Sequence, residues 1–352
     1  MSSNVIEPPA IDEAANETRP APIAVRDPGW RGLAIALGPP LAAGAALGVH
    51  GLLPVNAEIP MSWLDAVPAW RHPYPVMLGG VLGASLLLAL MQWAWRPLRA
   101  WVQHYAPLWT GALGAACLWE IITLKLAWLP QPYFPGPNQV LGGLLESWRI
   151  LLDSAWHSLL LLAAGYASGV CAGVVTGVLI GWFPRGRYWI MPAMKVLGPI
   201  PATALVPLVM TVFPGSFTSG AALIGWAVWF PVTMLTSSGI ANVRLSYLDV
   251  ARTLGAGRLY LIFRVAIPSA LPNIFVGLFV GLLTSFLTLI VAETVGVKSG
   301  LGNFLLWQQG FADYGKVFAG LLIMAVFCST ILTLLFKLRD WVLKWQKGVI
   351  KW

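Results

Sequence analysis

The sequence predicts an all-α fold, a polytopic bundle of about eight transmembrane helices, and three observations carry this prediction. The chain has 352 residues, of which 58% are hydrophobic and only 10% are charged. Soluble domains contain about 25% charged residues, so a water-soluble fold could not cover this much apolar surface. Apolar runs long enough to cross about 30 Å of hydrocarbon recur along the chain. The basic residues collect in the short segments between these runs.

Eight apolar runs have the length of a membrane span. They cover residues 32–53, 77–95, 108–129, 159–182, 196–213, 221–240, 274–295 and 317–336. The fifth run is the weakest span, because Pro199, Pro201 and Pro207 interrupt it. An even number of spans puts both termini on the same side of the membrane.

The distribution of basic residues predicts which side that is. If the N-terminus is cytoplasmic, the outer segments hold only Arg71, Arg149, Lys298 and Lys316, whereas the cytoplasmic segments hold most of the remaining Lys and Arg. This asymmetry follows the positive-inside rule. We therefore expect a multi-pass membrane protein with both termini in the cytoplasm.

Composition and motifs exclude several other classes of protein. The net charge of +8 is spread between apolar runs, not gathered on one face, so nucleic-acid binding is not expected. The three cysteines, Cys117, Cys171 and Cys328, lie inside apolar runs at spacings that fit neither a metal site nor a disulfide framework. No zinc-binding H-E-x-x-H and no phosphate-binding G-x-x-x-x-G-K-[ST] sequence occurs. We expect no catalytic residue, metal or cofactor in this chain.

A ladder of glycines in the fourth span predicts a close helix contact. Its members recur every four residues and therefore form one stripe along the helix: Gly165, Gly169, Gly173, Gly177 and Gly181. Helix association in lipid relies on small residues that let two backbones approach. Gly277 and Gly281 form a shorter version in the seventh span.

Three ionisable residues inside the spans require an explanation, because a charge at mid-membrane costs about 2.5–3.5 kcal/mol on insertion scales. Glu120 and Lys125 are five residues apart, about 140° around an α-helix, and so are not expected to pair locally. We expect Lys125 to extend to the outer surface. For Glu120 and Glu293 we favour a role in helix packing over a place in a transport path.

The longest polar cytoplasmic segment, residues 241–268, contains two short amphipathic patterns. Leu245, Leu248, Ala251 and Leu254 form an apolar stripe that ends before Gly255, a residue typical of helix ends. A second stripe of Leu259, Ile262 and Ala266 runs to Pro268. Such a segment can lie on the lipid surface or dock into a partner protein.

The spacing within this segment resembles the signature loop of permeases in binding-protein-dependent ABC importers. Asp249-Val250-Ala251, three residues, Gly255, nine residues and Val265-Ala266-Ile267-Pro268 follow the family pattern of Glu-Ala-Ala, three residues, Gly, nine residues and Ile-x-Leu-Pro. The four substitutions are conservative. The stretches at 201–208 and 292–302 also resemble the family, and are most similar to its nitrate, sulfonate, taurine and bicarbonate branch.

The resemblance implies a domain organisation. Residues 107–345 would form a six-span permease core with its coupling loop at 241–268. Residues 32–106 would add two N-terminal spans. Residues 1–31 and 346–352 would be cytoplasmic tails, the first of them disordered.

The resemblance also implies a location in the bacterial plasma (inner) membrane, partners and a mechanism. The loop would dock on a separate ATPase subunit through residues that include Asp249, Val250, Ala251, Arg252, Leu254, Gly255, Val265, Ile267 and Pro268. Two such ATPases would bind ATP and Mg²⁺, and a second permease chain, identical or related, would complete the path. An external binding protein would deliver a small solute, for example nitrate, a sulfonate, taurine or bicarbonate. The two permease chains would alternate between inward-open and outward-open forms.

Hydroxyl groups near the proline-rich fifth span are candidates for lining such a path. These are Thr203, Thr211, Thr233, Ser237, Thr284 and Thr288. Two other classes remain open on the residues alone: a secondary transporter, and a structural membrane subunit without an ATPase. The first normally has an internal repeat and an acidic ion-coupling cluster, and we find neither in the sequence.

Overall fold

The computed structural model describes residues 30–55, 73–92, 96–213, 215–295, 297 and 299–346. The expected tails at 1–31 and 346–352 lie almost wholly outside these residues, as do Arg71 and Lys298. The chain forms two compact units, one from Met1–Gln131 with Gly136–Asn138 and the other from Pro132–Pro135 with Gln139–Trp352. Among the described residues every regular element is a helix, which confirms the all-α prediction.

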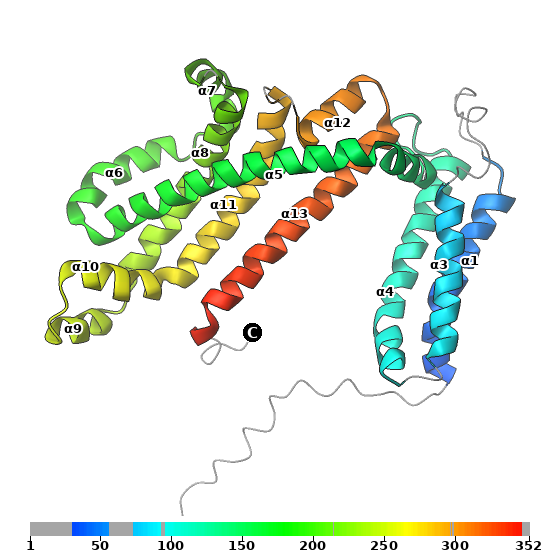
Figure 1. Ribbon diagram of the computed structural model, residues 1–352, viewed down its shortest axis with the longest axis horizontal. Helices are drawn as coiled ribbons and strands as arrows, with labels where there is room; N and C mark the ends of the chain where they lie inside the picture. Colours follow the sequence, from blue (N-terminus) through cyan, green and yellow to red (C-terminus); the bar gives the residue numbers. More distant parts are fainter. Residues whose placement is uncertain are drawn as a thin grey trace, which may run out of the picture. The chain divides into compact units, whose positions relative to one another are not determined.

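The described residues of the first unit form three spanning helices (Figure 1). They are α1 (Trp30–Leu52), α3 (Pro73–Met91) and α4 (Arg96–Glu120), and α4 continues into a π-helical turn, η2 (Ile121–Lys125). The helix α1 packs against both of the others through small side chains such as the buried Ala43 and Ala46. The predicted domain boundary between residues 106 and 107 falls inside α4. The third span thus belongs to the same compact unit as the first two, and the predicted permease core starting at 107 stays a prediction.

The second unit begins with a helix much longer than its predicted span. The helix α5 (Pro137–Trp182) has 46 residues, which corresponds to about 69 Å at 1.5 Å per residue, roughly twice the hydrocarbon thickness. The apolar run at 159–182 is only its C-terminal half. Leu151 of the N-terminal half packs against α12 (Leu301–Gly310) and α13 (Tyr314–Val342).

The glycine ladder of α5 lies directly against α8 (Ser216–Ala241). A Cβ at Gly165 would lie 2.6 Å from Ile224 Cβ, and one at Gly181 would lie 2.9 Å from Ile240 Cβ. At Gly169, Gly173 and Gly177 the nearest atoms also belong to α8. Successive glycines of α5 therefore meet successively later residues of α8, so the two helices run parallel.

Parallel packing of α5 and α8 requires the intervening chain to cross back through the membrane. This chain is the broken fifth span: α6 (Pro184–Leu197), the 3₁₀ turn η3 (Ala202–Leu205) and α7 (Val206–Val212). The α6 helix and the η3–α7 segment meet at an angle of 85°. Gly198 contacts Phe230 in the middle of α8, and Val206 packs near Leu223 at the start of α8. The segment therefore traverses the unit from one end of α8 to the other.

Among the described residues, helix length and composition give seven spans, or eight if the broken pair counts as one span. The last two are α11 (Ile267–Val295) and α13. The helix α11 runs antiparallel to α8 and has the most extensive contact with it. Gly277 and Gly281 face Val232 and Val228 of α8. Figure 1 shows α7 and α12 toward one end of the second unit, with α9 and α10 toward the other.

Substitution within the ladder should separate α5 from α8. In Gly173→Val the new side chain would overlap Val232, whose Cβ lies 2.8 Å from the Cβ position of residue 173. We expect a loss of about 3 kcal/mol or more, since overpacking of a rigid contact costs about 1–3 kcal/mol for small insertions. Gly142→Val in the same helix is the control, because the Cβ position at Gly142 meets no atom within 4 Å. Thermal unfolding in detergent measures both, and equal stability of the two variants would contradict the packing.

Candidate functional site

The connection between α8 and α11 forms two short helices, as expected from its amphipathic patterns. The first, α9, spans Leu245–Thr253, and the second begins as α10 (Arg258–Tyr260). Gly255 has a φ of +83°, a conformation that side chains other than glycine rarely adopt. The amide of Gly255 donates to the Arg252 carbonyl at 2.9 Å, and the amide of Ala256 donates to the Ala251 carbonyl at 3.0 Å. These two bonds form a Schellman motif, which fixes the direction in which the chain leaves α9.

The second half of the connection does not stop at Pro268. The chain passes from α10 through a π-helical turn, η4 (Leu261–Ala266), directly into α11, whose second residue is Pro268. Pro268 therefore lies inside a continuous helical segment, Arg258–Thr294. It directly follows a π-helical turn, in which the amide of Ile267 donates to the Ile262 carbonyl five residues earlier. Ala266 and Ile267 pack into a cluster with Ile240 and Ala270, which anchors the segment to α8 and α11.

Several apolar side chains of α9 are exposed. The expected stripe is split: Leu248 is buried at 8% exposure, whereas Leu245 and Leu254 are 72% and 83% exposed. Val250 is also exposed, and Asp249 pairs with Arg252 at 3.1 Å. One leucine therefore holds α9 on the protein, and the other apolar side chains leave exposed apolar surface around the helix.

The six predicted path hydroxyls do not form one site. Thr203 and Thr211 are exposed on the η3–α7 segment, while Thr233, Ser237 and Thr288 are buried. Thr233 Oγ1 lies 2.7 Å from Thr176 Oγ1, which also accepts a bond from Trp229 Nε1 at 3.0 Å. Thr284 Oγ1 donates to the Ala227 carbonyl at 3.2 Å. Most of these hydroxyls thus make contacts within or between helices, and a path role stays a prediction.

Glu293, near the end of α11, is fully buried and accepts two hydrogen bonds. Ser158 Oγ donates to Oε1 at 2.5 Å, and the amide of Gly302 donates to Oε2 at 2.7 Å. Ser158 in turn accepts the amide of Leu301 at 2.9 Å. A side chain at Gly300, where φ is +146°, would overlap the Glu293 carboxylate. The carboxylate therefore holds the N-terminus of α12 against α5, a geometry in which the helix dipole also favours negative charge.

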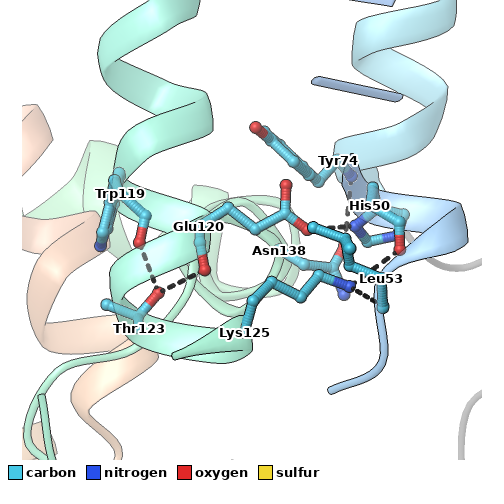
Figure 2. A network of polar contacts seen from close by, with 8 residues as sticks. All are labelled: His50, Leu53, Tyr74, Trp119, Glu120, Thr123, Lys125 and Asn138. Carbon is cyan, nitrogen blue, oxygen red and sulfur yellow. Dashed lines mark hydrogen bonds and ion pairs between the residues drawn. The ribbon is translucent and has the colours of Figure 1, made fainter. Parts of the chain in front are cut away.

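A second buried polar network lies in the first unit (Figure 2). Glu120 Oε1 is 2.6 Å from His50 Nδ1, and Lys125 Nζ donates to the carbonyls of His50 at 3.0 Å and Leu53 at 2.6 Å. The lysine thereby caps the C-terminal end of α1. Asn138 Oδ1 accepts the amide of Tyr74, which starts the neighbouring helix α3.

This network corrects the expectation for Lys125, whose side chain is 4% exposed and does not extend to the outer surface. The physical reason is the π-helical turn at Ile121–Lys125. A wider turn brings residues five apart close to the same helix face, so Glu120 and Lys125 both reach α1. Sequence reasoning missed His50 as their shared partner, because it lies 70 residues before Glu120.

Comparison with known proteins now decides the family. The model for "binding-protein-dependent transport system inner membrane component" matches residues 169–346, half of the chain, including α8, the α9–α10 connection and α11. The chain belongs to this family of ABC transporter permeases. It is thus the membrane-spanning permease subunit of an ABC importer and not an enzyme, and the resemblance seen in the signature loop is confirmed.

Several curated permeases are similar to it. SsuC of Bacillus subtilis, named for aliphatic sulfonates transport, is 33% identical over 53% of this chain and 67% of its own length. The formylaminopyrimidine permease ThiX of Halalkalibacterium halodurans is 26% identical over 65% and 92%. The taurine permease TauC of Escherichia coli is 30% identical over 59% and 78%. A solved chain of the inward-facing MetNI methionine ABC transporter matches with a TM-score of 0.48 at 13% identity, over 56% of the permease and 98% of that chain.

Removal of Glu120 should destabilise the first unit of the permease. In Glu120→Ala, His50 loses the buried carboxylate that lies 2.6 Å from its Nδ1, and removing one partner of a buried pair costs about 3–5 kcal/mol. Glu146→Ala is the control, because its ion pair with Lys316 at 3.2 Å is exposed on the glutamate side and should contribute less than about 1 kcal/mol. Unfolding in mixed micelles compares the two variants. A similar, small effect in both would contradict a stabilising role for the network.

Proposed function

We propose that this permease imports a small oxyanion of the sulfonate or taurine type, driven by separate ATPase subunits that dock on α9. The observation that carries the proposal is the exposed apolar face of α9, held at a fixed angle by the Gly255 motif. A permease with such a face needs a partner, because exposed leucines in water are unfavourable. In this proposal two ATPases, a second permease chain and an external binding protein complete the importer.

Docking on α9 requires a close approach, and the residues support one. Ala251 has a small side chain and Gly255 has none, and the exposed Leu254 lies between them in the sequence. Nothing lies within 4 Å of the Cβ position at Gly255, so a partner surface could come against the backbone there. A helix seated in a groove of the ATPase would follow the movements of that subunit and pass them to the permease.

ATP and Mg²⁺ belong to the partner in this proposal. The nearest approach to a phosphate-binding loop in this chain is Gly-Phe-Ala-Asp-Tyr-Gly-Lys-Val at residues 310–317, which ends in valine where Ser or Thr would contact Mg²⁺. Its Lys316 is already bound, to Glu146 and Asp313, each at 3.2 Å. The ammonium is therefore engaged with carboxylates and is not free to bind phosphate.

The cargo class rests on the named relatives. Two of them carry names of sulfonate or taurine transport, whereas the third is named for a formylaminopyrimidine. Sulfonate and taurine share a tetrahedral, singly charged oxyanion group. A path for this group would avoid exposed carboxylates, and the buried carboxylates Glu120 and Glu293 are both engaged by their own chain.

The α9 end of the second unit is cytoplasmic in this proposal. Arg185 and Arg187 at the start of α6 and Arg244, Arg252 and Arg258 around α9 all lie toward this end. The positive-inside rule assigns such an end to the cytoplasm. With eight spans, the N-terminus is then cytoplasmic as well.

A bulky residue in the docking face should uncouple transport. We expect Ala251→Trp to lower ATP-driven uptake of taurine or an alkanesulfonate into proteoliposomes, while the protein stays folded, because residue 251 is only partly buried. A decrease of about tenfold or more corresponds to a loss of about 1.4 kcal/mol in coupling. Leu306→Trp, an exposed site on α12, is the control. Unchanged uptake in Ala251→Trp would contradict docking at α9.

Cysteine labelling tests the orientation. Leu254→Cys and Phe311→Cys both place a thiol at an exposed position, the first after α9 and the second after α12. A membrane-impermeant maleimide should label residue 311 in spheroplasts and residue 254 only in inside-out vesicles. Labelling of residue 254 from the outside would reverse the proposed orientation.

A further inference from the structure

Lys195 occupies an unusual place in the broken fifth span. It lies in the last turn of α6, three residues before Gly198, where the span bends toward η3 and α7. The apolar runs of the sequence do not include it, because the predicted fifth span begins at residue 196. In the structure this lysine is part of the crossing segment.

The contact of Gly198 with α8 indicates how deep this place is. A side chain at Gly198 would overlap the ring of Phe230. Phe230 precedes the end of α8 at Ala241 by 11 residues, or about 17 Å at 1.5 Å per residue, which is about half of the hydrocarbon thickness. Lys195 is only about 4.5 Å along the helix from Gly198. Lys195 therefore lies close to the level of the middle of α8 and not beside the C-terminal end of that helix.

The side chain of Lys195 points away from the core of its own unit. Its neighbour Met194 is 1% exposed and faces inward, while Lys195 is exposed. Within the described residues no ion pair or side-chain hydrogen bond engages its ammonium. The ammonium groups of Lys125 and Lys316, by contrast, have such partners.

A lysine at this depth, without a partner on its own chain, is strongly disfavoured against lipid. Ionisable residues inside membranes face water-filled cavities or partner groups. The dipole at the C-terminal end of α6 favours a positive charge but does not neutralise it. The face of α6 that carries Lys195 must therefore border an aqueous or anionic environment.

We propose that Lys195 lines the translocation path and binds the anionic group of the cargo. This proposal rests on the proposed import of an oxyanion and adds the residue that receives it. The ammonium offers three hydrogen-bond donors to sulfonate oxygens. A single flexible lysine binds an anion through charge without enclosing it, which allows release to the cytoplasm when the importer returns to its resting form.

Uptake by charge variants tests the binding role. The complete importer, reconstituted with its ATPases and binding protein, is assayed with radiolabelled taurine and with an alkanesulfonate. Lys195→Met should lower uptake by about ten- to a hundredfold, as expected for loss of one charged hydrogen bond, and Lys195→Arg should keep most of it. Arg187→Met, at the start of the same helix, is the control and should transport normally. Normal uptake by Lys195→Met would overturn the proposal.

Thiol accessibility tests the position of Lys195 without knowledge of the cargo. Cys117, Cys171 and Cys328 are first replaced by alanine, and Lys195→Cys is treated with a sulfonate-bearing methanethiosulfonate reagent in inside-out membranes. We expect reaction at residue 195 and at Leu254→Cys, but not at Val326→Cys in the apolar α13. If wild-type importer moves neither sulfonate, the proposed cargo is wrong, and this second test still decides on Lys195. A residue-195 thiol that stays unreacted while residue 254 reacts would place Lys195 against lipid or protein and overturn the proposal.

Discussion

The close packing of α5 on α8 is the constraint on which the second unit depends. In hydrocarbon there is no hydrophobic force to bring two helices together, so the gain comes from backbone approach and dispersion contacts. Five glycines, from Gly165 to Gly181, allow this approach over most of the length of α8. The resulting parallel arrangement obliges the chain between the two helices to return across the membrane. That return path is the broken segment α6–η3–α7, and it leaves the ends of α5 and α8 together with α9 on one side.

Buried polar groups then secure the ends of the helices instead of forming an ion-coupling site. Glu293 holds the start of α12 through Ser158 and Gly302, and Lys125 caps the end of α1 beside the Glu120–His50 pair. Each of these buried charges is paired or hydrogen-bonded, as burial requires. An importer that takes its energy from ATP needs no cluster of exchangeable acids in its spans. The two networks are therefore compatible with the permease assignment.

Much of this architecture could be predicted from the sequence, because it depends on local patterns. Apolar length predicts the spans, the four-residue glycine spacing predicts a close contact, and the spacing from Asp249 to Pro268 predicts the loop between α8 and α11. What could not be predicted depends on contacts distant in sequence or on irregular backbone. The glycine ladder does not name α8 as its partner, and the π-helical turn at Ile121–Lys125 has no sequence signal that would turn Lys125 inward. Likewise, no sequence pattern marks Ser158 as the residue that bonds Glu293 of α11 and the Leu301 amide of α12.

The central claim is that this chain is the permease of an importer whose ATPase is a separate protein. The most direct test is to purify the tagged chain from its native membrane in mild detergent, identify the proteins that accompany it, and measure ATP hydrolysis by the complex. The account predicts a co-purifying ABC ATPase whose hydrolysis rises when the loaded binding protein is added. A chain that purifies alone and carries no ATP hydrolysis would contradict it.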